Sequence, residues 1–135
     1  MNHSIENKYI GELRTLSTHV KSRKNIITDA PIDNNGKGEA FAPTDLVSSA
    51  LCSCITTVMG ICAEKGKFEM PNSTAKITKL MSTNPRKISE IKIKINFEKN
   101  SLSDVQKRKL ISVGKNCPVA KSLNSDIKQT LIFNF

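Results

Sequence analysis

The segment from Pro43 to Lys65 constrains the fold more than any other part of this 135-residue chain. Proline suits the first position of a helix, where its missing N–H would have no partner, and Gly66 is a typical stop signal just beyond a helix end. Residues 46–63 carry no charge, although serines and threonines interrupt the apolar residues throughout. The pattern predicts one long helix in the core of a soluble protein and does not favour a membrane span.

Three of the four cysteines lie on this predicted helix. At about 100° per residue, Cys54 falls in the middle of an apolar stripe, Cys52 faces nearly the opposite way, and Cys62 lies at the edge of the stripe. The neighbours that define the stripe are Val47, Ala50, Leu51, Val58 and Ile61. We therefore expect Cys54 on the buried face, and we interpret Cys52 and Cys62 as small buried hydrophobic residues.

The fourth cysteine, Cys117, directly precedes Pro118, which again suits the first position of a helix. Unpaired backbone N–H groups and the positive end of the helix dipole at such a position lower a thiol pKa and favour the thiolate. A plain N-cap role is equally compatible with the spacing. As a pair, Cys54 and Cys117 could reduce a peroxide in two steps, in which one thiolate becomes a sulfenic acid and the other condenses with it to a disulfide.

The rest of the chain alternates between strand and helix patterns. The clearest strand is residues 91–97, where apolar and polar side chains alternate. Ser103 and Gln106 form a capping-box pattern for a second helix that ends near Gly114. Further strands are predicted at residues 8–18, 25–28, 75–79 and 127–135. We therefore predict a single α+β domain over residues 1–135 with an antiparallel sheet.

Composition limits the partners. The chain has 21 basic and 12 acidic residues, a net charge of +9, but the lysines are scattered and no aromatic motif lies among them. This favours a solvated basic surface over nucleic-acid binding. The cysteines form no CxxC pair, and His3 and His19 do not complete a zinc pattern, so no metal is expected. Residues 1–12 lack the apolar run of a signal peptide, and we expect a cytoplasmic protein that does not bind membranes.

Several segments resemble the OsmC/Ohr family, in the order in which that family has them. They are residues 9–14 (YIGELR), 18–19 (TH), 27–31 (ITDAP), 36–46 (GKGEAFAPTDL), the helix that carries Cys54, 84–86 (NPR) and 117–123 (CPVAKSL). The match covers nearly the whole chain, and the two cysteine segments with their flanking prolines make it specific.

The resemblance implies an OsmC-like α+β fold, with antiparallel sheets, a long central cysteine-bearing helix and two subunits intertwined as a homodimer. In the peroxidase members of the family, the helix cysteine is peroxidatic and the later cysteine is resolving, which correspond to Cys54 and Cys117. Organic hydroperoxides are their substrates, dithiols such as lipoylated proteins return the reducing equivalents, and no cofactor is involved.

One position departs from the peroxidase pattern. Those members carry a Glu directly after the helix-opening proline, paired with an Arg that polarises the thiol, but here the position is Thr44. The nearest carboxylate, Asp45, is turned by about 100° around the helix, and Glu39 in the preceding loop is another candidate. Arg14 and Arg23 are both candidates for the arginine, because a guanidinium favours a nearby thiolate.

Two functions remain open at this point. The first is thiol-dependent reduction of organic hydroperoxides by Cys54 and Cys117 in the oxidative stress response, without a metal or prosthetic group. The second is a non-enzymatic redox sensor, or a protein that binds an apolar small molecule, which Thr44 favours. A nucleic-acid-binding domain is a third reading, and the scattered lysines disfavour it.

Overall fold

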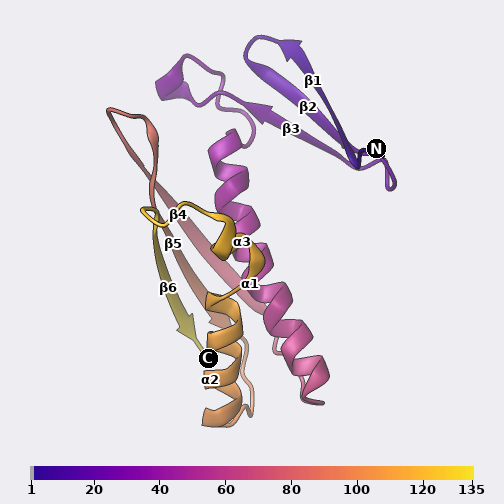
Figure 1. The fold of residues 1–135 in the computed structure, drawn as a ribbon, viewed down its shortest axis with the longest axis vertical. Coiled ribbons are helices and arrows are strands. Elements are labelled where there is room, and N and C mark those ends of the chain that lie inside the picture. Colours follow the sequence, from indigo (N-terminus) through magenta and orange to yellow (C-terminus); the bar gives the residue numbers. More distant parts are fainter. Residues whose placement is uncertain (1) are drawn as a thin grey trace. The chain divides into compact units, whose positions relative to one another are not determined.

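The computed structural model describes residues 2–135. They form two compact units, Met1–Leu46 and Val47–Phe135, which we call the N-terminal unit and the C-terminal unit (Figure 1). The fold is α+β, as predicted, with one three-stranded sheet in each unit. The single domain expected over residues 1–135 stays a prediction.

The sheet of the N-terminal unit is antiparallel and has the order β1-β2-β3. Its strands are β1 (Ile5–Gly11), β2 (Arg14–His19) and β3 (Asn25–Asp29), and the short 3-10 helix η1 (Ile32–Asn34) follows. The predicted strand over residues 8–18 is wrong as a single element, because a turn at Glu12 and Leu13 divides it. Both residues have a positive φ, 54° and 61°, as tight two-residue hairpin turns require.

Helix α1 (Pro43–Lys65) has the predicted bounds. At its start, the backbone N–H of Ala42 donates to the Asp45 carboxylate at 2.9 Å. At its end, the backbone N–H of Lys67 donates to Glu64 O at 3.1 Å, and that of Phe68 donates to Ala63 O at 3.0 Å. Lys67 has the left-handed conformation, φ 57°, so the chain leaves the helix through a Schellman motif.

The sheet of the C-terminal unit has the order β4-β5-β6. Its strands are β4 (Ser73–Ser82), β5 (Lys87–Phe97) and β6 (Lys128–Asn134), with α2 (Asp104–Lys115) and α3 (Pro118–Ser122) between β5 and β6. The β4–β5 pair is antiparallel and the β5–β6 pair is parallel. The prediction of antiparallel pairing was therefore wrong for β6, because the two helices carry the chain back before it re-enters the sheet.

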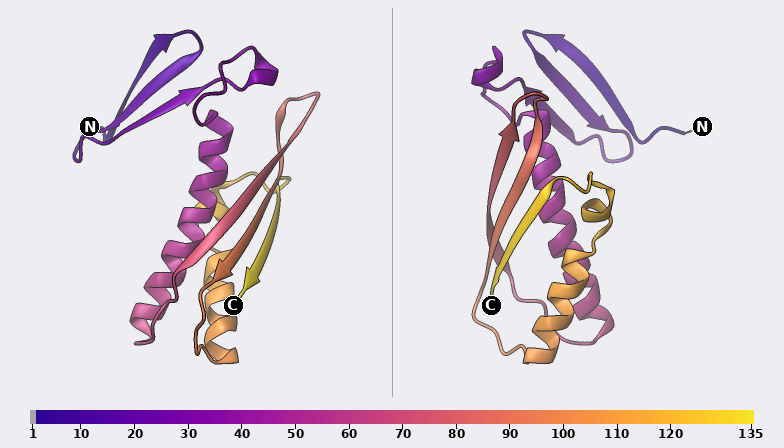
Figure 2. Two further views of the ribbon diagram at one scale, coloured as in Figure 1. Left: turned by 180° about the vertical axis from the view of Figure 1, so that it is seen from behind. Right: turned by 60° about the vertical axis from the view of Figure 1, so that its left-hand side comes forward.

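The core of the C-terminal unit lies between this sheet and the helices α1 and α2 (Figure 2). From β5 it receives Ile91, Ile93 and Ile95, and from α2 it receives Leu110; each is at most 1% exposed. Helix α1 contributes Ser48, Leu51, Cys52, Ile55, Met59 and Ala63. The capping box predicted at the start of α2, between Ser103 and Gln106, is present.

The buried face of α1 differs from the one predicted. Cys52 is on it, 8% exposed, whereas Cys54 is half-buried at its margin and Ile61 is 47% exposed. The predicted orientations of Cys52 and Cys54 around the helix were therefore wrong, whereas Cys52 is a small buried residue, as predicted. The physical reason is that apolar residues surround most of this helix, so the wheel alone does not decide which side the sheet covers. The sheet packs against the face of α1 that carries Leu51 and Ile55.

By length and composition alone, α1 could cross a membrane, but the core helix of a soluble protein meets the same two criteria. Its Leu51, Ile55 and Met59 side chains are fully buried against the rest of the C-terminal unit. The helix therefore packs here as a core element.

Candidate active site

Cys54 and Cys117 meet in the C-terminal unit. The two thiols are close enough to influence one another, because Cys54 is among the causes that raise the pKa of Cys117, after burial. Cys54 projects from the fourth turn of α1 and is half-buried, whereas Cys117 is 1% exposed. The structure therefore pairs one thiol that a small molecule can reach with one that is enclosed.

Cys117 is the N-cap of α3, as predicted. Its Sγ accepts a hydrogen bond from the backbone N–H of Ala120 at 3.4 Å. Burial is nevertheless the largest influence on this thiol and raises its pKa; the hydrogen bond from Ala120 acts in the opposite direction, and Cys54 adds to the rise. The expectation of a lowered pKa at Cys117 was wrong, because a short helix end does not offset the loss of water around the sulfur.

We predict that Cys117 reacts with iodoacetamide more slowly than an ordinary thiol at pH 7 to 8, and that its rate rises only above about pH 8.5, the usual thiol pKa, since the thiolate is the nucleophile. The pKa of the Cys117 thiol is higher in the folded protein than in the unfolded chain. Its contribution to the free energy of unfolding is therefore fully present below the unfolded pKa and is lost as the pH rises through the folded pKa. Peptide-resolved mass spectrometry measures the rate, with urea-unfolded protein as control. Rapid labelling of native Cys117 at pH 7 would contradict the prediction.

A mostly apolar cavity of about 460 Å³ adjoins Cys117, between α1 and the α2–α3 segment. Its apolar walls come from Val58 and Ile61 of α1 and from Val113 and Pro118 on the other side. Also in its lining are Cys62, Lys65, Gly66, Lys109 and Asn116. The cavity gives an apolar molecule access to the neighbourhood of the thiol pair. The sequence did not predict this cavity, and Cys62, which we interpret from the sequence as a small buried residue, lies in its lining.

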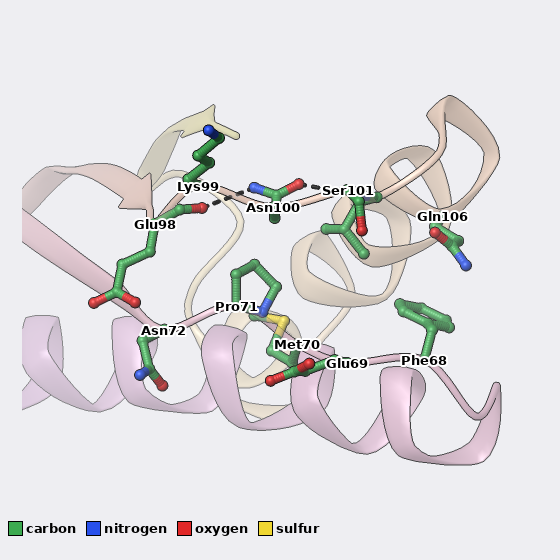
Figure 3. Close-up of a pocket in the computed structure, with 11 residues that line it drawn as sticks. Phe68, Glu69, Met70, Pro71, Asn72, Glu98, Lys99, Asn100, Ser101 and Gln106 are labelled. Atoms are coloured by element: carbon green, nitrogen blue, oxygen red, sulfur yellow. Dashed lines mark hydrogen bonds between the residues drawn. The ribbon is translucent and has the colours of Figure 1, made fainter.

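A second cavity of about 400 Å³ is polar and lies between residues 68–72 and 98–106. Figure 3 shows Glu98, Asn100 and Ser101 on one side of it and residues 68–72 on the other. The Asn100 side chain is already engaged, since its amide donates to Glu98 O at 2.9 Å and its oxygen accepts from Leu102 N–H at 3.2 Å. No thiol lines this cavity, and it offers no evident chemistry.

An ion-pair cluster stands in the N-terminal unit around Arg14. Its Nε donates to Asp29 Oδ1 at 2.6 Å and its Nη2 to Asp29 Oδ2 at 2.9 Å, while Nη2 also approaches Glu39 Oε2 at 3.3 Å. Asp29 is 1% exposed and accepts a further hydrogen bond from the Glu39 backbone N–H at 3.0 Å. These hydrogen bonds lower the pKa of Asp29 and raise that of Arg14, so the pair stays ionised.

We predict that Asp29→Asn destabilises the N-terminal unit at neutral pH and flattens its acid dependence. The folded pKa of Asp29 lies below its unfolded value of about 3.9. The contribution of this carboxylate to the free energy of unfolding is therefore present above that pH and is lost as the pH falls through the folded pKa. Tyr9, the only tyrosine in a chain without tryptophan, reports on this unit by fluorescence. Glu98→Gln is the exposed control, and an unaltered urea midpoint for Asp29→Asn would refute the prediction.

The model of the OsmC-like protein family matches residues 36–131, which is most of the chain. The chain belongs to this family. No curated protein matches it significantly. A crystal structure from Psychrobacter arcticus 273-4, a proposed osmotic stress induced and detoxification response protein, is 42% identical, with a TM-score of 0.93 over 99% of this chain and 97% of that one.

More distant structures share the OsmC-like fold. An organic hydroperoxide resistance protein OsmC from Legionella pneumophila is 13% identical, with a TM-score of 0.74 over 98% of each chain. A proposed organic hydroperoxide resistance protein from Vibrio cholerae, with captopril bound in one of its active sites, is 15% identical, with a TM-score of 0.70 over 99% of this chain and 93% of that one. At such identities the likeness concerns the fold.

The other predicted site residues of this OsmC-like chain lie in the N-terminal unit. Arg14 and Glu39 come together around Asp29. Asp45 caps the start of α1 through Ala42. Arg23 occupies the turn between β2 and β3, with φ 60°, and its backbone N–H donates to His19 O at 2.8 Å. Of the two candidate arginines, Arg14 is the one whose guanidinium is held in place by ion pairs.

Sequence reasoning missed Asp29, although a usable signal existed. The predicted strands end at residue 18 and begin again at residue 25, so a hairpin pairs Thr18 with Asn25, and the same register carried along the strands pairs Arg14 with Asp29. Directly opposed residues of opposite charge on one face of a sheet form an ion pair.

Proposed function

We propose that this OsmC-like protein reduces organic hydroperoxides, with Cys54 as the peroxidatic thiol and Cys117 as the resolving thiol. The observation that carries the proposal is the proximity of these two thiols, one half-buried and one enclosed. The adjoining cavity with its apolar walls suits the organic part of such a substrate.

The chemistry balances with a hydroperoxide and a dithiol. The Cys54 thiolate attacks the outer peroxide oxygen, the O–O bond breaks, and the alcohol leaves after taking up a proton. Cys54 is then a sulfenic acid, and attack by the Cys117 sulfur releases water and forms a disulfide. A dithiol reduces this disulfide by thiol–disulfide exchange. No step needs a metal or a prosthetic group.

The relatives support a peroxide-related stress role. Structures that share the fold include organic hydroperoxide resistance proteins, and one of them binds captopril in an active site, in keeping with a site for small organic molecules. We infer a cytoplasmic setting, where dithiols are available to reduce the protein.

A second function, slow redox sensing or small-molecule binding, is favoured by one observation. Arg14, the arginine whose guanidinium is held by ion pairs, already donates to both oxygens of Asp29 and to Glu39, and Thr44 supplies no carboxylate in the usual place. A guanidinium shared by two carboxylates stabilises a thiolate less. Oxidation by cumene hydroperoxide no faster than that of free cysteine would favour this function.

We also infer a homodimer. Six apolar side chains of the β1-β2-β3 hairpin region are between 43% and 66% exposed. They are Ile5, Tyr9, Ile10, Leu13, Ile26 and Ile27. Apolar residues so concentrated in one small unit mark a protein-binding surface, and the same surface on a second copy is the simplest partner. A monomer in sedimentation equilibrium at micromolar concentration would exclude it.

The test of the proposed reaction is disulfide mapping. Reduced protein receives one equivalent of cumene hydroperoxide, is quenched in acid, alkylated and digested. We expect a Cys54–Cys117 disulfide to form faster than free cysteine is oxidised, and a dithiol to reverse it. Disulfides at Cys52 or Cys62 in its place, or none, would refute the assignment.

A further inference from the structure

The outer face of the C-terminal sheet carries charges that the thiol chemistry does not use. Side chains alternate between the two faces of a strand, so the residues of β5 between the buried Ile91, Ile93 and Ile95 point away from the core. Figure 2 shows α1 and α2 on the other side of this sheet. By the register of the strands, the outer face consists of alternate residues from Thr74 to Leu80 of β4, from Glu90 to Asn96 of β5 and from Lys128 to Asn134 of β6.

Four lysines of this face form one row across all three strands, which we call the lysine row. Lys76 of β4 lies directly opposite Lys94 of β5, and Lys92 is two residues away from Lys94 on the same face. Lys128 of β6 is diagonal to Lys92, whose direct partner is Thr130. All four lysine side chains are exposed. Such neighbours lie about 5–8 Å apart, which is within the Debye length of about 10 Å at 0.1 M salt.

The lysine row has no matching set of acids. Glu90 is the only carboxylate among the residues of this face, and it already accepts a hydrogen bond from the Thr130 hydroxyl. In the part of the chain that the structure describes, none of the four ammonium groups has an ion-pair partner within 4.0 Å. Like charges directly opposite one another destabilise a sheet, so an anion over Lys76 and Lys94 would relieve their repulsion.

The net charge of the chain lies in the same unit. Residues 1–46 contain six basic and six acidic residues, whereas residues 47–135 contain 15 basic and six acidic residues. The C-terminal unit therefore carries the whole net charge of +9 (15 − 6 = 9). The four lysines of the row are scattered in the sequence, from which we expected no membrane binding, and they come together only when β4, β5 and β6 pair.

We propose that the lysine row docks the outer face of this sheet on an anionic lipid bilayer. Each lysine close to such a surface strengthens binding about fivefold, so a row of four forms an effective electrostatic contact. Ile132, which is 48% exposed and lies opposite Lys94 on β6, adds an apolar contact with the headgroup region. The docking is independent of the proposed thiol chemistry, because the thiols lie among the helices on the other side of the sheet.

The composition of the face favours a bilayer over other polyanions. Its residues include no aromatic ring and no arginine, so it lacks the stacking surfaces and guanidinium forks typical of nucleic-acid interfaces. Lysine is also depleted in protein–protein interfaces, where arginine and aromatic residues are enriched. A bilayer needs no directed contacts, because several lysines within a Debye length of its surface are sufficient for attraction.

Vesicle sedimentation tests the proposal on the full chain. Reduced protein is mixed with vesicles of phosphatidylcholine alone, or of equal parts phosphatidylcholine and phosphatidylglycerol, and the bound fraction is measured at increasing NaCl concentration. We expect binding to the anionic vesicles only, and its loss as salt shortens the Debye length. Equal binding to both kinds of vesicle, or no binding to anionic vesicles at low salt, would overturn the proposal. A short DNA duplex that displaced the protein from the vesicles at equal phosphate concentration would identify nucleic acid as the partner, and would also overturn it.

Variants assign the binding to the lysine row. Lys76→Gln/Lys92→Gln/Lys94→Gln should lower the partition coefficient on anionic vesicles roughly 100-fold, since each charge contributes about fivefold. The matched control is Lys99→Gln/Lys109→Gln/Lys115→Gln, which removes the same net charge from exposed lysines outside the sheet of the same unit. It should lower the partition coefficient less than about tenfold. Equal losses in the two folded triple variants, with folding checked by circular dichroism, would mean that net charge alone attracts the protein, and would overturn the site.

Discussion

Cys54→Ser lowers the turnover of cumene hydroperoxide by a dithiol roughly a thousandfold or more, to the background rate. A serine hydroxyl is not ionised at neutral pH, so it cannot attack the O–O bond as a thiolate does. The measurement is consumption of the hydroperoxide at fixed dithiol concentration, with correction for the direct reaction of the two reagents.

Two matched variants sharpen this prediction. Cys52→Ser changes a cysteine two residues away that is buried in the core, 8% exposed, and should keep the rate per folded molecule. Cys117→Ser should permit the first oxidation but not the disulfide, so that excess hydroperoxide converts Cys54 to sulfinic acid, a gain of two oxygen atoms visible in the intact mass. Unchanged turnover in Cys54→Ser would end the peroxidase assignment.

Ile55→Ala destabilises the C-terminal unit by about 2–5 kcal/mol, the usual cost of removing a large buried aliphatic side chain. Ile55 is fully buried next to Cys54 in the sequence, and its Cγ2 lies close to Gly114 of α2. Truncation leaves a void between α1 and α2, the two helices that bring the thiols together. The expected loss is a large part of the 5–15 kcal/mol that typical domains possess.

Urea unfolding followed by circular dichroism measures this loss, at one fixed protein concentration because association would add to stability. Ile132→Ala is the matched control, since it removes the same atoms from a side chain that is 48% exposed, and it should cost well under 1 kcal/mol. Equal costs for the two variants would show that Ile55 is not in the core as described.

Local chemistry made much of this fold predictable. Pro43 and the residues after Lys65 set the bounds of α1, the Ser103–Gln106 capping box set the start of α2, and Cys117-Pro118 placed α3. Each signal acts within a few residues through one unpaired N–H or one fixed φ. These features could be predicted because no distant contact is needed to produce them, and the structure confirms them.

The missed features depend on contacts between distant segments or on unusual turn residues. Glu12 and Leu13 are poor residues for a turn with positive φ, so Gly11, which has φ 88°, was the only local sign of the break between β1 and β2. The direction of β6 depends on where α2 and α3 return the chain. The buried face of α1 depends on the sheet that covers it, and it was this choice that exchanged the expected places of Cys52 and Cys54.

The thiol contact between α1 and α3 joins residues that are 63 positions apart in the chain (117 − 54 = 63). A disulfide at this contact would close a long loop that contains β4, β5 and α2. Loop closure of that length removes chain entropy from the unfolded state equivalent to about 4 kcal/mol. Oxidation would then do more than record an encounter with a peroxide. It would hold the C-terminal unit against unfolding and proteolysis until a dithiol released it, so that its lifetime under oxidative stress would depend on the redox state of a single pair of sulfurs.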